Sequence, residues 1–161
     1  TFTVTLKHKI ADESYYVKKH LEESGISREI LKDRSILLAE DNDLNAEIAA
    51  VILERAGLKV ERVEDGLQCI SRITEMPAGT YDIILMDIQM PKMDGYKATQ
   101  TIRNLSDQEK ACIPIIAMTA NAFEEDKRAA IAAGMNGHIA KPIQVDKLLS
   151  ILAEMIRQQE N

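Results

Sequence analysis

The chain has 161 residues, of which 45% are hydrophobic, and a formal net charge of −6 at pH 7. This length and composition suit one globular domain with a sizeable core, and no stretch reaches the roughly 18 consecutive apolar residues that a membrane-spanning helix needs. Residues 35–161 hold 13 Lys/Arg against 20 Asp/Glu without a basic stripe, so we expect neither a nucleic-acid partner nor membrane contact.

The first 34 residues do not share the pattern of the remainder. They are almost neutral, with seven Lys/Arg and six Asp/Glu. Residues 2–6 alternate apolar and polar side chains as a strand does, whereas residues 15–23 are polar with a helical tendency. We therefore expect residues 1–34 to be a tail and linker at the end of a preceding domain, with a frayed or vector-derived tail as the alternative.

From residue 35 onward, short apolar runs alternate with amphipathic stretches, which is typical of successive βα units. We expect strands at residues 35–39, 58–63, 82–86, 114–118 and 137–140. Helices are expected at about 44–56, from about 65, from 95 to about 105, after 121 to 134, and from 145. This pattern predicts an α/β domain over residues 35–161, with five helices around a doubly wound, five-stranded parallel sheet of flavodoxin-like order 2-1-3-4-5.

Two features of the predicted helices bear on the core. In the first helix, the apolar spacing predicts that Leu44, Ile48, Val51 and Ile52 face inward. Cys69 and Cys112 lie far apart and lack the spacing of a metal site. We expect both to be buried reduced thiols, which fits a cytoplasmic protein.

Acidic residues follow two strands that this topology makes neighbours. Glu40 and Asp41 come directly after the first strand, and Asp87 follows the third. Because the carboxyl ends of parallel strands share one edge of a sheet, we expect the three carboxylates to meet there. Two like charges about 4 Å apart repel by roughly 4 kcal/mol at an effective dielectric of 20, so the cluster needs a counter-charge. Helix capping is the other use of such aspartates, and Asn42 or Asp43 suits that task at the first helix.

Mg²⁺ fits this cluster, since it prefers oxygen ligands and bridges phosphate oxygens. We assign Asp41 and Asp87 as direct ligands, Glu40 as a ligand through water, and the backbone carbonyl of Gln89 as a further ligand. A carboxylate shielded by a metal is a competent nucleophile toward phosphorus. Asp87 is therefore the candidate phosphoryl acceptor.

Two further strand ends bring polar groups to the same edge. Lys141 ends the fifth strand, and we expect its ammonium to pair with Asp87 and later with a phosphoryl oxygen, with a solvated lysine before a turn as the alternative. Pro142 follows it, and we expect the bond between them to be cis. Thr119 follows the fourth strand, where its hydroxyl suits either donation to a phosphoryl oxygen or an ordinary helix cap. The candidate catalytic set is thus Asp87, Lys141 and Thr119.

Taken in this order, these residues resemble the receiver domain of two-component response regulators. The resemblance covers about residues 35–156 and lies in Glu40-Asp41, Met86-Asp87, Met90-Pro91-x-Met93-Asp94-Gly95, Thr119-Ala120 and Lys141-Pro142. It implies that Asp87 accepts a phosphoryl group from a phosphohistidine, in a reaction that depends on Mg²⁺. The donor would be a histidine kinase or a histidine phosphotransfer domain.

The resemblance also implies a switch and a slow loss of the phosphoryl group. Thr119 is expected to turn inward and bind the phosphoryl group, and a ring at position 138 is expected to follow. That ring is usually Tyr or Phe, whereas here it is His138, which leaves open a pH-sensitive gate or a filler at the strand edge. Gln89 and Asn121 are expected to flank the attacking water and to set the rate of dephosphorylation.

The loops are most similar to those of C-terminal receivers of hybrid sensor histidine kinases, and residues 1–6 resemble the last strand of a kinase ATP-binding domain. The first helix near Asn45, Ile48 and Ala49 is expected to dock a histidine-bearing helix, with plain core packing as the alternative. An aspartate-nucleophile phosphatase is a second possible function, although Gln89 stands where such enzymes usually have a second Asp. A degenerate interaction module is the third, and the complete acid set argues against it.

Overall fold

The computed structural model describes residues 15–161 except Tyr16, His20, Ser24 and Ala122. The strand expected at residues 2–6 lies outside the described residues. Within the described part, no helix is both long and apolar enough to cross a bilayer.

The core of the domain is a parallel sheet of five strands. Its members are β1 (Ser35–Ala39), β2 (Lys59–Val63), β3 (Ile83–Asp87), β4 (Ile115–Thr119) and β5 (Gly137–Ala140), in the order β2-β1-β3-β4-β5. The predicted fold class and strand order are confirmed, and β2 lies at one edge of the sheet. The switch in strand order falls between β1 and β3, where the register pairs Ala39 with Met86.

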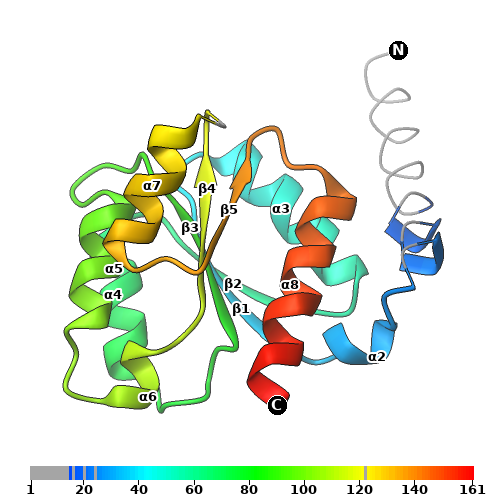
Figure 1. The fold of residues 1–161 in the computed structure, drawn as a ribbon, viewed down its shortest axis with the longest axis horizontal. Coiled ribbons are helices and arrows are strands. Elements are labelled where there is room, and N and C mark those ends of the chain that lie inside the picture. The colour runs from blue at the N-terminus through cyan, green and yellow to red at the C-terminus, as the bar shows by residue number, and fades with distance from the viewer. Residues whose placement is uncertain (1–14, 16, 20, 24, 122) are drawn as a thin grey trace.

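Helices cover both faces of the sheet (Figure 1). The helices α3 (Asp43–Arg55) and α8 (Val145–Glu160) lie on one face, and α4 (Gly66–Glu75), α5 (Gly95–Arg103) and α7 (Glu124–Ala133) lie on the other. These are the five predicted helices, with ends shifted by a few residues. Two four-residue helices, α2 (Arg28–Leu31) and α6 (Gln108–Ala111), were not predicted, because one turn is too short to show a helical period.

Alternate residues of each buried strand serve the two faces. Ile36 and Leu38 of β1 belong to the cluster under α3 and α8, whereas Leu37 and Ala39 belong to the cluster under α4, α5 and α7. The continuous apolar runs in the sequence arise from this double coverage.

The inward face of α3 differs from the prediction. Leu44 and Ile48 are 64% and 40% exposed, and the buried residues are instead Ala46, Ala49, Ile52 and Leu53. A count of large apolar side chains misses this face, because small alanines let a helix pack closely on the sheet. Of the residues expected to dock a histidine-bearing helix, Ile48 is thus exposed, whereas Ala49 packs in the core as the alternative has it.

The cysteines also differ from one another. Both are free, and Cys69 is buried in α4, where burial and then the charge of Asp65 raise the pKa of its thiol to about 12. Cys112 is exposed at the end of α6, so the expectation of a second buried thiol was wrong.

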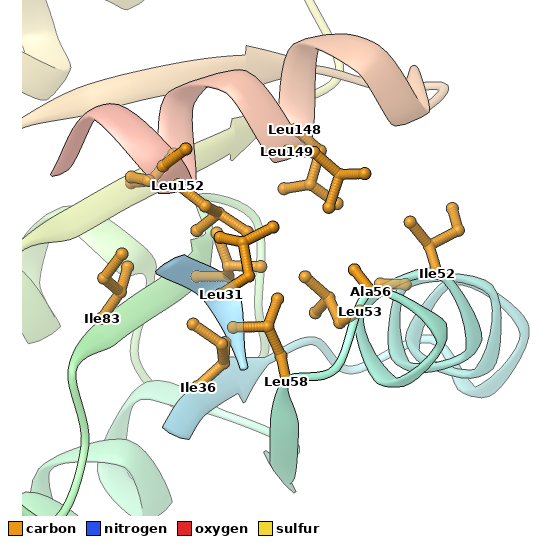
Figure 2. Close-up of a cluster of buried hydrophobic side chains, with 14 of the residues drawn as sticks. Leu31, Ile36, Ile52, Leu53, Ala56, Leu58, Ile83, Leu148, Leu149 and Leu152 are labelled. Carbon is orange, nitrogen blue, oxygen red and sulfur yellow. The ribbon is translucent and has the colours of Figure 1, made fainter. Parts of the chain in front are cut away.

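The described part of residues 15–34 packs on the domain. Val17, Leu21, Ile26 and Leu31 are buried in the same cluster as α3 and α8, and α2 contacts α8. Figure 2 shows Leu31 among Leu53, Leu58 and Leu152. A boundary at residue 34 remains a prediction, but the core itself extends upstream of it.

We expect Leu31→Ala to lower the free energy of unfolding by about 2–4 kcal/mol, because it leaves a cavity at a fully buried site. Urea unfolding followed by far-UV circular dichroism measures this loss. Leu67→Ala is the matched control, since Leu67 is 46% exposed and should cost less than about 1 kcal/mol. Equal small losses in both variants would show that α2 adds nothing to the stability of the domain.

Candidate functional site

Three carboxylates meet at the carboxyl edge of the sheet, as predicted. Glu40 and Asp41 follow β1, Asp87 ends the neighbouring β3, and one carboxylate oxygen from each lies within 4.8 Å of the others. Glu40 and Asp87 are buried, with 1% and 4% exposure, whereas Asp41 is exposed. The cluster therefore has a buried floor and one side open to solvent. Within the described chain, this is the group of acids close enough to share a metal ion.

Lys141 supplies the counter-charge that the cluster requires. Its Nζ lies 2.7 Å from Glu40 Oε2 and 3.2 Å from Asp87 Oδ2. The Lys141-Pro142 bond is cis, as predicted. The backbone N–H of Lys141 donates to the Thr119 carbonyl across 2.7 Å, so the end of β4 fixes the residue that carries the ammonium.

The charges in this pocket shift the pKa values of its members. Burial raises the pKa of Asp87 from 3.8 to about 6; the Glu40 charge adds to this effect, and Lys141 opposes it. Burial alone would lower the pKa of Lys141, but the hydrogen bond to Glu40 and the charge of Asp87 outweigh it, so its pKa is raised. One ammonium thus faces an excess of negative charge, which favours binding of a cation.

The three carboxylates differ in how many of their oxygens are engaged. Glu40 Oε1 accepts from the Asn42 N–H at 3.1 Å, while its other oxygen accepts from Lys141. Asp87 Oδ1 accepts only a long hydrogen bond, 3.3 Å, from the Gln89 N–H. The Asp41 carboxylate accepts no hydrogen bond within the described chain. Asp41 and Asp87 are therefore better placed as direct metal ligands than Glu40.

Asn42 caps the first helix, as the sequence allowed. Its side chain accepts from the Asn45 N–H at 3.0 Å. Glu40 and Asp41 are therefore not needed to cap α3.

The loop after β3 turns so tightly that only glycine fits at its end. The Gly95 N–H donates to the Ile88 carbonyl at 2.9 Å, and a Cβ on Gly95 would lie 2.4 Å from the carbonyl oxygen of Asp87. Asp94 then caps α5 by accepting from the Lys97 N–H at 2.9 Å. The glycine of the Met93-Asp94-Gly95 motif is thus required by packing directly behind Asp87.

The same loop is tied to the turn before α4. Asp65 is 2% exposed, caps α4 by accepting from Gln68 N–H, and lies 3.6 Å from Lys92 Nζ. The Gly66 N–H donates to the Met93 carbonyl at 3.3 Å. This anchor was not predicted from the sequence, although the Asp-Gly pair before α4 signalled a tight turn.

The remaining predicted site residues lie after β3, at and after the end of β4, and on β5. Thr119 is buried at the end of β4, where its hydroxyl donates to the Asn121 carbonyl. Gln89 and Asn121 are exposed, and His138 is half-buried on β5. The Thr119 hydroxyl is thus engaged within the loop after β4. Its binding of a phosphoryl group remains a prediction, as do the roles of Gln89, Asn121 and His138.

Arg62 was missed as a functional candidate. It lies on the edge strand β2, and no role was predicted for it from the sequence. Its guanidinium contacts the loop that carries Glu40 and Asp41. The available signal in the sequence was a positively charged residue near the carboxyl end of β2, the strand next to β1, which Glu40 and Asp41 follow.

Known proteins resemble this chain in sequence and in fold. A family model described as the response regulator receiver domain matches residues 36–153. The chain belongs to this family. Its acidic triad of Glu40, Asp41 and Asp87 is consistent with the Mg²⁺-dependent phosphoaspartate site of a phosphorelay receiver.

Relatives of this receiver domain include histidine kinases. The peroxide stress-activated histidine kinase mak1 of Schizosaccharomyces pombe is 37% identical over 123 residues, which are 76% of this chain and 8% of that protein. The chain spans between 5% and 16% of the length of such curated relatives. The predicted likeness to the receiver domains of hybrid histidine kinases is therefore confirmed as a similarity to a part of such proteins.

Two solved structures are informative. The receiver domain of the sensor histidine kinase PA1611 from Pseudomonas aeruginosa, with magnesium coordinated in its active site cleft, is 38% identical with a TM-score of 0.70, covering 78% of this chain and 98% of that one. A chain from the co-crystal of the histidine phosphotransfer protein Ypd1 with the receiver domain of Ssk1, from Saccharomyces cerevisiae, is 26% identical with a TM-score of 0.72, covering 80% and 92%. Receiver domains therefore include ones that bind histidine phosphotransfer proteins.

The raised pKa of Asp87 predicts a pH-dependent cost to the metal-free domain. Between about pH 4 and pH 6 the folded chain binds more protons at Asp87 than the unfolded chain does, so the free energy of unfolding falls as the pH rises. Asp87→Asn removes this cost. We expect the metal-free variant to exceed the wild type by roughly 1–3 kcal/mol at about pH 8, with the difference vanishing near pH 4.

Urea unfolding in EDTA across this pH range measures the difference. Asp94→Asn is the matched control, because asparagine caps a helix as well as aspartate does, and it should show no such pH-dependent gain. A wild type as stable as Asp87→Asn at every pH would contradict the burial of an ionised Asp87.

Proposed function

We propose that this receiver domain accepts a phosphoryl group on Asp87 from a phosphohistidine and thereby switches its conformation. The observation that carries the proposal is the convergence of Glu40, Asp41 and Asp87 around the ammonium of Lys141. Lys141 offsets part of the negative charge of this set, and exposed Asp41 leaves one side of it open to solvent. The match to the receiver family supports the same function.

The donor set fits Mg²⁺ by its chemistry, since all its side-chain ligands are oxygens. Asp41 and Asp87 would hold the ion directly, Glu40 through water, and the Gln89 carbonyl would be a further ligand. The engaged oxygens of Glu40 support its indirect role. When bound, the ion supplies charge neutralisation for the phosphoryl oxygens.

The transfer is an in-line displacement at phosphorus. A carboxylate oxygen of Asp87 forms a bond to phosphorus as the phosphorus–nitrogen bond of the phosphohistidine breaks, and the bonding electron pair leaves with the imidazole nitrogen. The product is an acyl phosphate on Asp87. Lys141, already within 3.2 Å of Asp87 Oδ2, stabilises the negative charge on the transferring group.

The switch and its reversal involve the neighbouring loops. We assign Thr119 to bind the phosphoryl group after leaving the Asn121 carbonyl, and His138 to respond on the adjacent strand β5. Gln89 and Asn121, both exposed beside the site, are assigned to set the rate at which water removes the phosphoryl group.

The proposed donor is a histidine kinase or a histidine phosphotransfer domain, which would dock on α3 beside the site. Leu44 and Ile48 are exposed there, and Ile48 lines a small cavity with Asn45, Lys141, Pro142 and Ile143. The names of two relatives, a histidine kinase and a hybrid histidine kinase, support an origin in a hybrid histidine kinase, and we place the domain in the cytoplasm. In that case, residues 1–34 link this domain to the kinase part.

Acetyl phosphate tests the chemistry without a partner. We expect intact-mass spectrometry to show a gain of one phosphoryl group only when Mg²⁺ is present, because the pocket must offset the charge of the incoming group. Asp87→Asn should abolish the gain, whereas Asp94→Asn in the same loop should retain it. Labelling of Asp87→Asn at wild-type level would refute the assignment, and steady turnover of phosphate esters would point to a phosphatase instead.

Ile48→Asp tests the docking face. It places a charge on an exposed apolar side chain, so we expect transfer from a phosphorylated histidine phosphotransfer protein to slow by about 5–30-fold. Labelling by acetyl phosphate should be unchanged, because the small donor needs no docking face. Ile131→Asp on α7 is the matched control, since Ile131 is 71% exposed on the opposite face. Equal slowing by both substitutions would place the donor elsewhere.

A further inference from the structure

Arg62 connects the edge strand to the turn that carries two of the acids. In the parallel register it pairs with Leu38, two residues before Glu40. Its Nε lies 3.0 Å from the Glu40 carbonyl oxygen, and its Nη2 lies 3.1 Å from the Asp41 carbonyl oxygen. Its Nη1 lies 2.8 Å from Asp43 Oδ1. One guanidinium therefore spans the turn between β1 and α3.

At Glu40 and Asp41, the guanidinium of Arg62 donates to backbone carbonyl oxygens and not to the carboxylates. Arg62 binds the main-chain carbonyls of Glu40 and Asp41, while the carboxylate of Glu40 is engaged by Lys141 and Asn42. Within the described chain, Arg62 donates to neither of these two carboxylates. It thus fixes the peptide planes from which both side chains project, without competing with a cation for their oxygens.

A second bond holds the same turn from the strand itself, because the Glu40 N–H donates to the Val63 carbonyl at 3.1 Å. With this bond, the N–H and the carbonyl of Glu40 are both attached to β2. The orientation of the acidic turn is therefore set by the edge strand, on the side of the cluster opposite Lys141 and β5 in the strand order.

We propose that Arg62 is a positioning residue for the divalent-cation site, holding the backbone of Glu40 and Asp41 so that their carboxylates face Asp87. This inference rests on the proposed function. Only arginine offers a planar fork that reaches three acceptors at fixed angles, whereas lysine offers a single ammonium. The fork, more than the charge, is what the turn requires.

If Arg62 acted through its charge, its loss would change Mg²⁺ binding in the opposite direction from the loss of its positioning role. A positive charge near a cation pocket repels the ion, so loss of the Arg62 charge alone would tighten Mg²⁺ binding. Loss of positioning would weaken it. Arg62→Lys keeps the charge and loses the fork, and Arg62→Met loses both while keeping most of the apolar stem.

Calorimetric titration with Mg²⁺ alone, on the whole chain, separates the two effects. We expect the dissociation constant to rise by about tenfold in both Arg62→Lys and Arg62→Met, as for other groups that orient metal ligands. Lys59→Met removes one positive charge from the same strand and should leave the constant unchanged, since among the described residues Lys59 forms an ion pair with exposed Asp33 alone. Asp43→Asn weakens the third contact alone and should have little effect, because Asp43 is 89% exposed.

A second readout excludes a merely structural effect. The Mg²⁺ concentration for half-maximal labelling by acetyl phosphate should rise about tenfold in Arg62→Lys, while the rate at saturating Mg²⁺ stays within about twofold of wild type. Unchanged or tighter Mg²⁺ binding in Arg62→Lys overturns the inference and leaves the proposed function intact. A wild type that binds no Mg²⁺ overturns both. If Arg62→Met does not fold, Arg62→Lys decides the outcome alone.

Discussion

The ion triplet of Glu40, Asp87 and Lys141 is the constraint around which this domain is organised. Two buried carboxylates cannot both stay ionised at low cost unless a cation lies between them. Lys141 meets both within 3.2 Å, yet the pKa of Asp87 remains raised to about 6. One ammonium thus offsets only part of the negative charge of the pocket. The remaining negative charge would favour a second cation, as the proposed Mg²⁺ site requires.

Meeting this constraint requires a particular topology. The acids come from β1 and β3, which are neighbours only because the chain reverses its winding direction there, and the lysine comes from β5, two strands beyond β3. The strands themselves are anchored by apolar residues on both faces, so their ends are fixed in space. The loops then aim the side chains: Gly95 lets the chain pass behind Asp87, and Arg62 holds the turn after β1. The fixed strand ends and the contacts that hold each loop together set the distances between the carboxylates and the Lys141 ammonium.

The sequence predicted those parts that depend on periodic patterns or on the carboxyl ends of strands. Continuous apolar runs reveal buried parallel strands, so the strand order and the meeting of Glu40, Asp41 and Asp87 could be predicted. The face of α3 could not, because alanine is only weakly apolar and helix-on-sheet distance decides whether Ala49 or Ile48 is buried. Arg62 was missed for a related reason: its role lies in contacts with backbone carbonyls, and carbonyls have no signature in a sequence. The buried Leu31 belongs to a single helical turn, which shows no period.

The unequal contacts of Lys141 suggest how a change at Asp87 would be felt elsewhere. Its ammonium is closer to Glu40, at 2.7 Å, than to Asp87, at 3.2 Å. On the proposed function, an acyl phosphate on Asp87 adds negative charge on one side of this shared ammonium and draws it away from Glu40. Lys141 is bonded through its backbone N–H to the Thr119 carbonyl, so the strand end that carries the ammonium is also attached to the residue proposed as the switch. The same residue that balances the resting charges is therefore placed to couple the modified carboxylate to the β4 loop, and no separate relay between the two is needed.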